Sequence, residues 1–238
     1  MTTKTKNENK EMIKAILRSQ RCQRNWDLSK QIPEEDLEVI KTAATQCPSK
    51  QNVQFYKPIF ITNREVIEKI HDASMLGGII NKDTKEKRYS TQSQLLANLL
   101  VVLVETEDSS QQERSPVTKA GKGLEFSESD YNSHMEHFSS EEEFYSSHKD
   151  EYTRDKNVAV GIAAGYMNLA SSLLGYSTGC CQCFKQEEVK EILGIDNQVL
   201  LIMGIGHKDE TRPRREHHMH PGEYFATCDK HIEAELIA

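Results

Sequence analysis

Two groups of arginine side chains could bind an anionic ligand. Arg18, Arg21 and Arg24 are spaced three residues apart, so they fall near one face of a predicted helix. Arg212 and Arg214 follow a predicted strand late in the sequence. The planar fork of N–H groups on a guanidinium matches the oxygens of a phosphate. A solvated basic surface would have the same composition, so the arginines alone leave both interpretations open.

A polar loop is predicted between the second helix and the first strand. It contains Pro48, Ser49, Lys50 and Asn52. A proline followed by small and amide side chains is typical of a turn whose backbone groups are not all paired with each other. The loop could therefore contact a ligand, or it could be an ordinary connection.

Three cysteines are crowded into one tetrapeptide, in which Cys180, Cys181 and Cys183 surround Gln182. A metal site that also used the His-rich segment 217–220 is one interpretation, but adjacent cysteines fit the usual C-x₂-C chelate poorly. A buried thiol cluster is favoured, because cysteine packs as a small apolar side chain. The spacing is unlike that of a secreted disulfide framework, so it predicts a reducing, cytoplasmic location.

The elements that must position these residues are read from the apolar pattern. Helices are expected over residues 11–24, from Pro33 to before Pro48, and over 64–71, 92–98, 157–174 and 186–193. Strands are expected over 58–62, 99–105 and 199–204, residues 77–89 should be irregular, and residues 204–206 should form a turn. The helix over 157–174 is nearly uncharged, so it should be buried on most sides. Helices and strands do not alternate strictly, which favours an α+β fold.

Composition excludes several classes of protein. The chain has 238 residues and a formal net charge of −7, which gives no broad positive field for nucleic acid. No apolar run approaches the roughly 20 residues needed to span a bilayer, so no membrane partner is expected. Residues 1–10 should be disordered, and residues 11–238 should form one domain. Residues 107–156 should form an acidic lid or insertion, because acidic and aromatic residues are interspersed there.

Taken in order, these segments resemble the nitroreductase family of flavin enzymes over roughly residues 11–105 and 157–215. Arg21 and Arg24 match the family's opening basic motif, in which Cys22 stands where serine is usual. Residues 48–54 match its Pro-Ser-x-x-Asn-x-Gln loop, and the Ala- and Gly-rich helix before residues 175–178 is similar to its central helix. The sequence departs from the family at Gln94, where lysine is frequent, and in the Cys-Cys-Gln-Cys turn.

The resemblance implies a fold, a cofactor and a set of ligand-binding residues. The fold would be a central mixed, mostly antiparallel sheet flanked by helices, with the long buried helix at a homodimer interface. FMN would lie at that interface. The expected cofactor-binding residues are Arg21, Cys22, Arg24, Pro48, Ser49, Lys50, Asn52, Gln94, Cys181, Gln182, Cys183, Arg212 and Arg214.

The resemblance also implies how these residues divide the cofactor between them. Arg21, Cys22 and Arg24 would border its ribityl chain and pyrimidine edge, and Arg212 and Arg214 would hold its phosphate. The loop with Pro48, Ser49 and Asn52 would come from the partner subunit. A backbone N–H at Gln182 or Cys183 would point toward flavin N5.

The implied reaction is a ping-pong hydride transfer from NAD(P)H, through the flavin, to a small-molecule acceptor such as a nitroaromatic, quinone or enone. The flavin carries the chemistry, so no catalytic side chain and no metal are expected. Three other hypotheses stay open. They are a flavin-binding module or a dehalogenase or flavin-fragmenting enzyme, a metal-binding protein using the cysteines and histidines, and an interaction protein built on the acidic segment 125–151.

Overall fold

The computed structural model describes residues 6–50, 53–106, 141–226, 232 and 234–236. In chain order its elements are α1 (Lys6–Ser19), α2 (Glu34–Thr45), β1 (Tyr56–Ile61), α3 (Arg64–Asp72), β2 (Gly77–Asn81), β3 (Lys87–Ser90), the 3₁₀ helix η2 (Ser93–Leu96), β4 (Leu99–Glu105), α6 (Glu141–Leu173), β5 (Ser177–Cys181), α7 (Gln186–Leu193), β6 (Val199–Gly206), β7 (Glu216–His217) and β8 (His220–Phe225). Helices combined with antiparallel sheets confirm the predicted α+β class.

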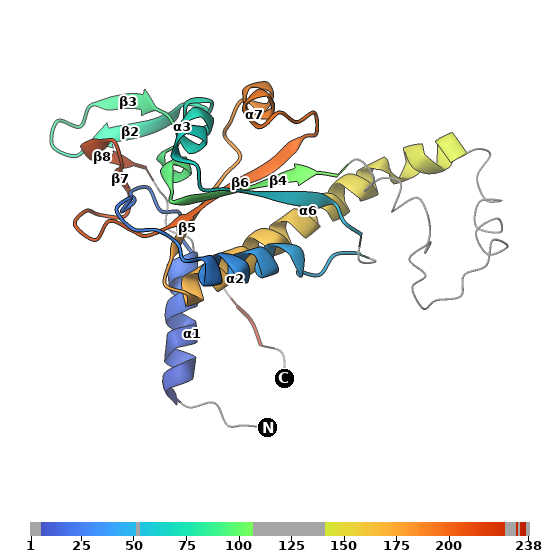
Figure 1. Cartoon of the computed structure of the whole chain (residues 1–238), viewed down its shortest axis with the longest axis horizontal. Coiled ribbons are helices and arrows are strands. Elements are labelled where there is room, and N and C mark those ends of the chain that lie inside the picture. Colours follow the sequence, from blue (N-terminus) through green and yellow to red (C-terminus); the bar gives the residue numbers. More distant parts are fainter. Residues whose placement is uncertain (1–5, 51–52, 107–140, 227–231, 233, 237–238) are drawn as a thin grey trace.

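A four-stranded sheet in the order β1-β4-β6-β5 forms the centre of the molecule (Figure 1). Every pairing among these strands is antiparallel, in agreement with the mostly antiparallel sheet that the resemblance implied. Strand β4 lies between two neighbours and is buried along almost its whole length. A strand covered on both faces carries apolar side chains on both, which explains the uninterrupted run in its sequence.

Helices cover both faces of the central sheet, so the core has two halves. On one face, α2 and α6 pack against alternate residues of β4 and β6 such as Val101 and Met203. On the other face, α3, α7 and η2 pack against the intervening residues such as Leu100 and Ile202. Figure 1 shows α6 running beneath the sheet beside α2, while α1 projects from the same side.

The second sheet corrects the prediction for residues 77–89. These residues form the hairpin β2–β3 instead of an irregular segment, within a sheet in the order β3-β2-β8-β7. Ile79 of β2 is buried and lies opposite Phe225 of β8. The many charged residues of the hairpin face solvent, so only a few apolar positions mark it as a strand pair.

Other element boundaries also differ from the sequence prediction. Helix α1 occupies residues 6–19 instead of 11–24, so it begins within the segment expected to be disordered. Residues 204–206 belong to strand β6 and do not form a turn. The helix predicted over 157–174 extends back to Glu141 as part of α6, into the region expected to be an insertion.

Helix α6 is buried on one side only in the single chain, which corrects the expectation of burial on most sides. Met167 packs in the core, whereas Val158, Tyr166 and Leu173 are exposed. Residues 107–140 of the predicted acidic lid lie outside the described residues, so the lid stays a prediction. Within the described residues, none of the helices combines the length and apolar character required to span a lipid bilayer.

Candidate functional site

The candidate site is built where the segment after α1 crosses the edge of the central sheet. The backbone N–H of Gln23 donates to the Thr178 carbonyl of β5 at 2.8 Å. One residue later, the N–H of Arg24 donates to the Arg214 carbonyl at 3.1 Å. The basic motif is therefore held between β5 and the loop that follows β6, and it brings the two arginine groups of the sequence together.

Two glycines of the sheet allow this close packing. A Cβ at Gly179 would lie 2.7 Å from Gln94 Cβ and 3.2 Å from the Gln23 carbonyl oxygen. A Cβ at Gly204 would overlap the Gln94 carbonyl oxygen. Because neither glycine carries a side chain, η2 lies directly on β5 and β6, and Gln94 is placed beside the basic motif.

The guanidinium of Arg24 lies in a cradle of amide and aromatic groups. It donates to Gln94 Oε1, lies 3.4 Å from Gln92 Oε1 and stacks 4.4 Å from the centre of the Phe225 ring. Gln94 Nε2 in turn donates to Gln92 Oε1 at 3.2 Å. Burial lowers the pKa of Arg24, and within the described part of the chain no carboxylate pairs with it. Arg24 is thus a partly desolvated cation that could stabilise an anion.

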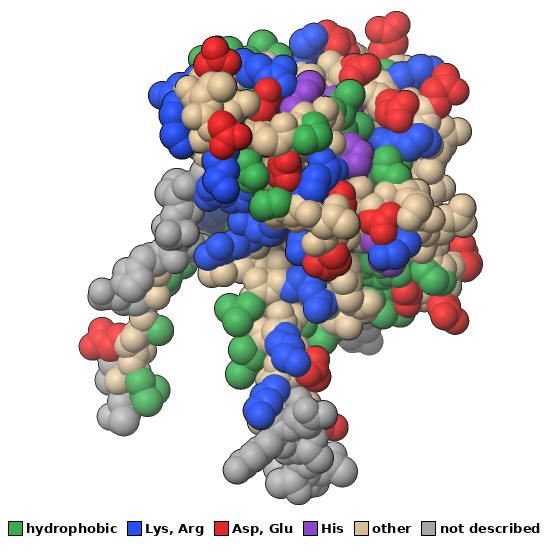
Figure 2. Space-filling model, turned by 90° about the vertical axis from the view of Figure 1, so that its left-hand side faces the viewer, with side chains coloured by type: hydrophobic (Ala, Val, Ile, Leu, Met, Phe, Trp, Pro, Cys, Tyr) green, Lys and Arg blue, Asp and Glu red, His purple; other side chains and the backbone are tan. Residues whose placement is uncertain are grey.

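A basic pocket of about 600 Å³ lies beside this cradle. Its lining residues are Leu17, Arg18, Gln20, Arg21, Lys30, Gly175, Ser177, His207, Lys208, Glu210 and Arg214. In Figure 2, Lys and Arg side chains gather at the junction between the body of the molecule and its lower projections. Five cations and a single carboxylate make the pocket suitable for a phosphate group.

The cations of this pocket differ in how far they are already compensated. Lys208 pairs with Glu210 at 2.7 Å, and Lys30 pairs with Asp27 at 2.9 Å. Arg214 donates to the Cys22 carbonyl, and burial followed by the charge of Arg21 lowers its pKa. An anion bound between them would relieve the repulsion that Arg21 exerts on Arg214, so these two arginines are the candidate phosphate ligands of the pocket.

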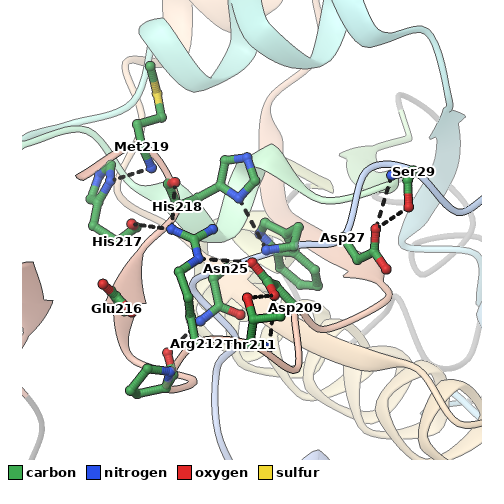
Figure 3. Close-up of polar contacts among 12 residues, drawn as sticks. Asn25, Asp27, Ser29, Asp209, Thr211, Arg212, Glu216, His217, His218 and Met219 are labelled. Carbon is green, nitrogen blue, oxygen red and sulfur yellow. Dashed lines mark hydrogen bonds and ion pairs between the residues drawn. The ribbon is translucent and has the colours of Figure 1, made fainter. Parts of the chain in front are cut away.

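The structure does not bring Arg212 to this pocket. Its Nε donates to Asp209 at 2.9 Å, and its Nη1 donates to the His218 carbonyl at 3.0 Å (Figure 3). Asp209 also accepts from Thr211, and these contacts lower its pKa to about 2. Arg212 therefore fastens the loop before β7, and its role as a phosphate ligand stays a prediction.

The cysteines of the tetrapeptide divide between the two faces of β5. Cys180 packs in the α6 half of the core, and Cys181 packs in the η2 half. Cys183 is exposed, and Gln182 beside it is exposed too. Cys22 lies next to this strand, with its Sγ 3.8 Å from the Cys180 carbonyl oxygen. Cys22, Cys181 and Cys183 are all close enough to Arg24 to influence its pKa.

The predicted ligand loop lies apart from the basic pocket within the same chain. Ser49 Oγ donates to the Val53 carbonyl at 2.8 Å, and Lys50 pairs with Asp155 of α6. Neither these residues nor Pro48 line the pocket. Asn52 lies outside the described residues.

The histidines do not join the cysteines in a metal site. Across the described ranges, no group of three or more His, Cys, Asp or Glu side chains is arranged to hold a metal ion. His217 is buried, accepts from the Met219 N–H at 3.1 Å and lies 3.0 Å from Ser90 Oγ. These contacts assign it to the packing of the second sheet.

Sequence reasoning missed several residues of the site. Gln92 and Phe225 complete the cradle of Arg24, and Lys208 lines the basic pocket. Lys208 follows a predicted strand in the same way as the late arginines, so its position was a usable signal. Nothing in the local sequence of Gln92 or Phe225 indicates that they meet Arg24.

Comparison with known proteins defines the class to which this fold and site belong. The sequence model of the Nitroreductase family matches residues 17–207. The chain therefore belongs to the nitroreductase family. No curated protein matches it significantly.

Solved structures share the fold at low sequence identity. A nitroreductase-like protein of Streptococcus mutans, smu.346, is 14% identical with a TM-score of 0.66, covering 98% of this chain and all of its own. CLA-ER, an enone reductase of gut-bacterial fatty acid saturation, is 16% identical with a TM-score of 0.58, covering 84% and 89%. A protein of Exiguobacterium sibiricum crystallised with FMN is 17% identical with a TM-score of 0.56, covering 89% and 93%. At this identity the likeness establishes the fold alone.

Proposed function

We propose that this protein is an FMN-dependent oxidoreductase that takes hydride from NAD(P)H and reduces a nitroaromatic, quinone or enone acceptor. One observation carries the proposal. A short segment places Arg24 in a buried amide and aromatic cradle and Arg21 in a basic pocket directly beside it. Family membership and the likeness to an FMN complex and an enone reductase support it.

The donor groups fit the two ends of FMN. Its phosphate carries two negative charges, which suit Arg21, Arg214 and Lys208 in the basic pocket. Its pyrimidine edge presents hydrogen-bond acceptors and, when reduced, negative charge, which suits the guanidinium of Arg24. The amides of Gln92 and Gln94 can exchange hydrogen bonds with the same edge. Gln94 thus places a neutral amide where the family often has lysine.

FMN supplies the redox chemistry when bound, since it can accept hydride from NAD(P)H and deliver reducing equivalents to an acceptor. Arg24 lowers the free energy of negative charge at the pyrimidine edge because it is a cation in a site of low dielectric. Arg21 and Arg214 would hold the phosphate of the bound cofactor in the basic pocket. Of the two backbone N–H groups expected to face N5, that of Cys183 donates to Cys181 Sγ at 3.4 Å, which favours Gln182.

A homodimer would complete the site. In the single chain, α1 exposes Ile13, Ile16 and Leu17, and α6 exposes Tyr166 and Leu173, each about half exposed or more. Helices α1 and α6 pack against each other, so these side chains offer an apolar surface for a second copy. The loop with Pro48, Ser49 and Asn52 would then reach the flavin of the partner subunit.

The proposal is tested on the purified full-length protein. We expect a yellow protein with flavin absorbance, a dimeric mass in solution, and bleaching by NADH or NADPH that an added quinone or nitroaromatic reverses. A panel of acceptors separates a reductase from a flavin-binding module, which would bleach without turnover. A colourless protein that binds no added FMN would overturn the proposal.

A further inference from the structure

We propose that Cys183 and Cys181 form an oxidant-sensitive thiol pair, in which Cys183 reacts first with a peroxide and Cys181 then closes a disulfide with it. The inference goes beyond the proposed function, because it rests on the two thiols and does not require bound flavin.

The backbone holds both cysteines at one corner of the molecule. Cys181 ends strand β5, where it pairs with Ile202. Cys183 lies two residues later, and its carbonyl accepts the Met75 N–H at 2.8 Å. The Cys181 sulfur lies 3.4 Å from the Cys183 nitrogen and 3.7 Å from the Cys183 carbonyl oxygen. The shielded sulfur is therefore already turned toward the backbone of the exposed cysteine.

A disulfide across this corner is within geometric reach. Residues two apart in an extended chain have Cα atoms about 6.6–7.2 Å apart. Disulfides usually span about 4.4–6.8 Å between Cα atoms. Strand β5 ends at Cys181, so Gln182 lies between this strand and the isolated bridge of Phe184 with Ser74, and a bend at Gln182 would shorten the span between the two cysteines.

The two thiols differ in access, and this sets the order of their reactions. Cys183 is exposed, whereas Cys181 is only 3% exposed. The guanidinium of Arg24 lies close enough to both thiols to interact with them electrostatically. Burial raises the pKa of Cys181 to about 11, so Cys181 is a poor first nucleophile. Cys183 is thus the site of attack, and Cys181 is the second, resolving thiol.

The remaining thiols near this corner are less suited to the reaction. Cys180 points to the opposite face of β5, where it packs in the core beneath α6. Burial raises its pKa to about 12. The sulfur of Cys22 lies 3.8 Å from the Cys180 carbonyl oxygen. Cys181 is therefore the expected partner of Cys183.

The chemistry balances with hydrogen peroxide as the oxidant. The Cys183 thiolate attacks one peroxide oxygen, an S–O bond forms, the O–O bond breaks, and the departing hydroxide takes a proton to become water. The Cys181 sulfur then attacks the sulfenic sulfur of Cys183, an S–S bond forms, and the hydroxyl leaves as a second water with the Cys181 proton. Two thiols and one peroxide give one disulfide and two waters. A dithiol reductant restores both thiols.

Peptide mapping of the full-length protein tests this inference. The protein is treated with a small molar excess of hydrogen peroxide, denatured, alkylated and digested with trypsin, which releases residues 157–185 as one peptide with all three cysteines of the tetrapeptide. We expect this peptide to be two hydrogens lighter than its reduced form, with only Cys180 alkylated. Dithiothreitol should restore alkylation of all three.

Three variants make the assignment specific. In Cys181→Ser, oxidation should stop at a sulfenic acid on Cys183 that dimedone traps. In Cys183→Ser, oxidation of the peptide should slow by about tenfold or more. The matched control Cys180→Ala, which changes the neighbouring thiol on the other face, should still form the disulfide.

The mapping of the unmodified protein decides the matter even if a variant fails to fold. Three alkylated cysteines after peroxide treatment would overturn the inference, and so would a disulfide that joins Cys183 to Cys22. Flavin absorbance is recorded on the same samples. A protein without flavin that still forms the Cys181–Cys183 disulfide would contradict the proposed function and leave this inference standing.

Discussion

The guanidinium of Arg24 lies 4.4 Å from the centre of the Phe225 ring. These residues belong to opposite ends of the described chain, and Phe225 reaches Arg24 through strand β8 of the second sheet. An aromatic face attracts a cation without neutralising it. Phe225 therefore fixes Arg24 in place and leaves its charge available to a ligand.

The first prediction concerns this contact. Arg24→Gln should weaken FMN binding about tenfold or more, because it removes a charge-assisted hydrogen bond worth about 1.5–3 kcal/mol. Phe225→Leu should weaken FMN binding less than Arg24→Gln does, because the guanidinium charge remains and only a cation–π contact of about 0.5–2 kcal/mol is lost. Fluorescence titration of the flavin-free protein measures both.

The neighbouring Tyr224→Leu is the matched control for Phe225→Leu. Tyr224 lies on the same strand, 6.0 Å from the ammonium of Lys82, and does not contact Arg24. It should bind FMN as the unmodified protein does. Equal loss of FMN affinity in the two variants would mean that the integrity of strand β8, and not the Phe225 ring over Arg24, supports FMN binding.

The second prediction distinguishes the two candidate phosphate ligands, Arg21 and Arg214, from Arg212, which holds the loop before β7 in place. Riboflavin lacks the phosphate of FMN, so a residue that binds the phosphate affects only FMN. Arg21→Gln and Arg214→Gln should each lower the preference for FMN over riboflavin about tenfold. Arg212→Gln should keep this preference, because its side chain holds Asp209 and the His218 carbonyl. Loss of the preference in Arg212→Gln would instead support the sequence prediction that Arg212 binds phosphate.

The parts of the fold that the sequence predicts well are those with strong local patterns. Residues 99–105 and 186–193 were predicted with the observed bounds, because one is an uninterrupted apolar run and the other ends at Gly194 in a left-handed conformation. The hairpin β2–β3 was missed because its stability depends on β8, far away in the sequence. The pattern of neighbouring residues gives no information about a strand that pairs with them from far away in the sequence.

In the candidate site, too, residues in local motifs were predicted and residues that meet only through long-range contacts were not. Arg21 and Arg24 were singled out because they fall in a short motif, and Gln94 because the family resemblance marked its position; the structure brings Arg24 and Gln94 into contact. Gln92 and Phe225 were missed because their role arises only when η2 and β8 fold against the motif. The sequence also provided no sign that Asp209, three residues before Arg212, pairs with its guanidinium.

The third prediction concerns the glycine beneath Gln94. Gly204→Ala should lower the free energy of unfolding by about 1–3 kcal/mol, because the added Cβ overlaps the Gln94 carbonyl and forces η2 away from the sheet. It should also weaken FMN binding through the displaced Gln94. Urea unfolding and flavin titration measure the two effects.

Gly78→Ala is the matched control, since Gly78 also lies in a strand and a Cβ there meets nothing within 4 Å. Alanine is better than glycine in a strand interior by about 0.5–1 kcal/mol, so this variant should be as stable as the unmodified protein or slightly more so. Equal destabilisation of both variants would show that glycine flexibility, and not close packing under Gln94, governs position 204.

The fourth prediction is a loss of stability in mild acid that arises from the second sheet. Burial lowers the pKa of His217 from 6.5 to about 4, and burial also lowers the pKa values of His71 and His218. The Nδ1 atom of His217 accepts the Met219 N–H, which requires a neutral ring. Between pH 6.5 and about 4, this histidine is protonated in the unfolded chain but largely neutral in the folded chain. The free energy of unfolding should therefore fall as pH decreases from 6.5 toward 4, by at most about 1.4 kcal/mol per pH unit for this group.

Urea unfolding at several pH values checks this dependence, with His217→Gln as the test variant, because glutamine does not titrate. We expect His217→Gln to be less stable at neutral pH but to lose less stability between pH 6.5 and 4. His220→Gln is the comparison variant, since His220 lies beside His217 with ring centres 4.5 Å apart and is less buried. Burial also lowers the pKa of His220, and its charge adds to the lowering at His217, so this variant should lose part of the acid dependence but less than His217→Gln does. If His217→Gln keeps the full acid dependence, the buried charge that destabilises the fold belongs to His71 or His218 instead.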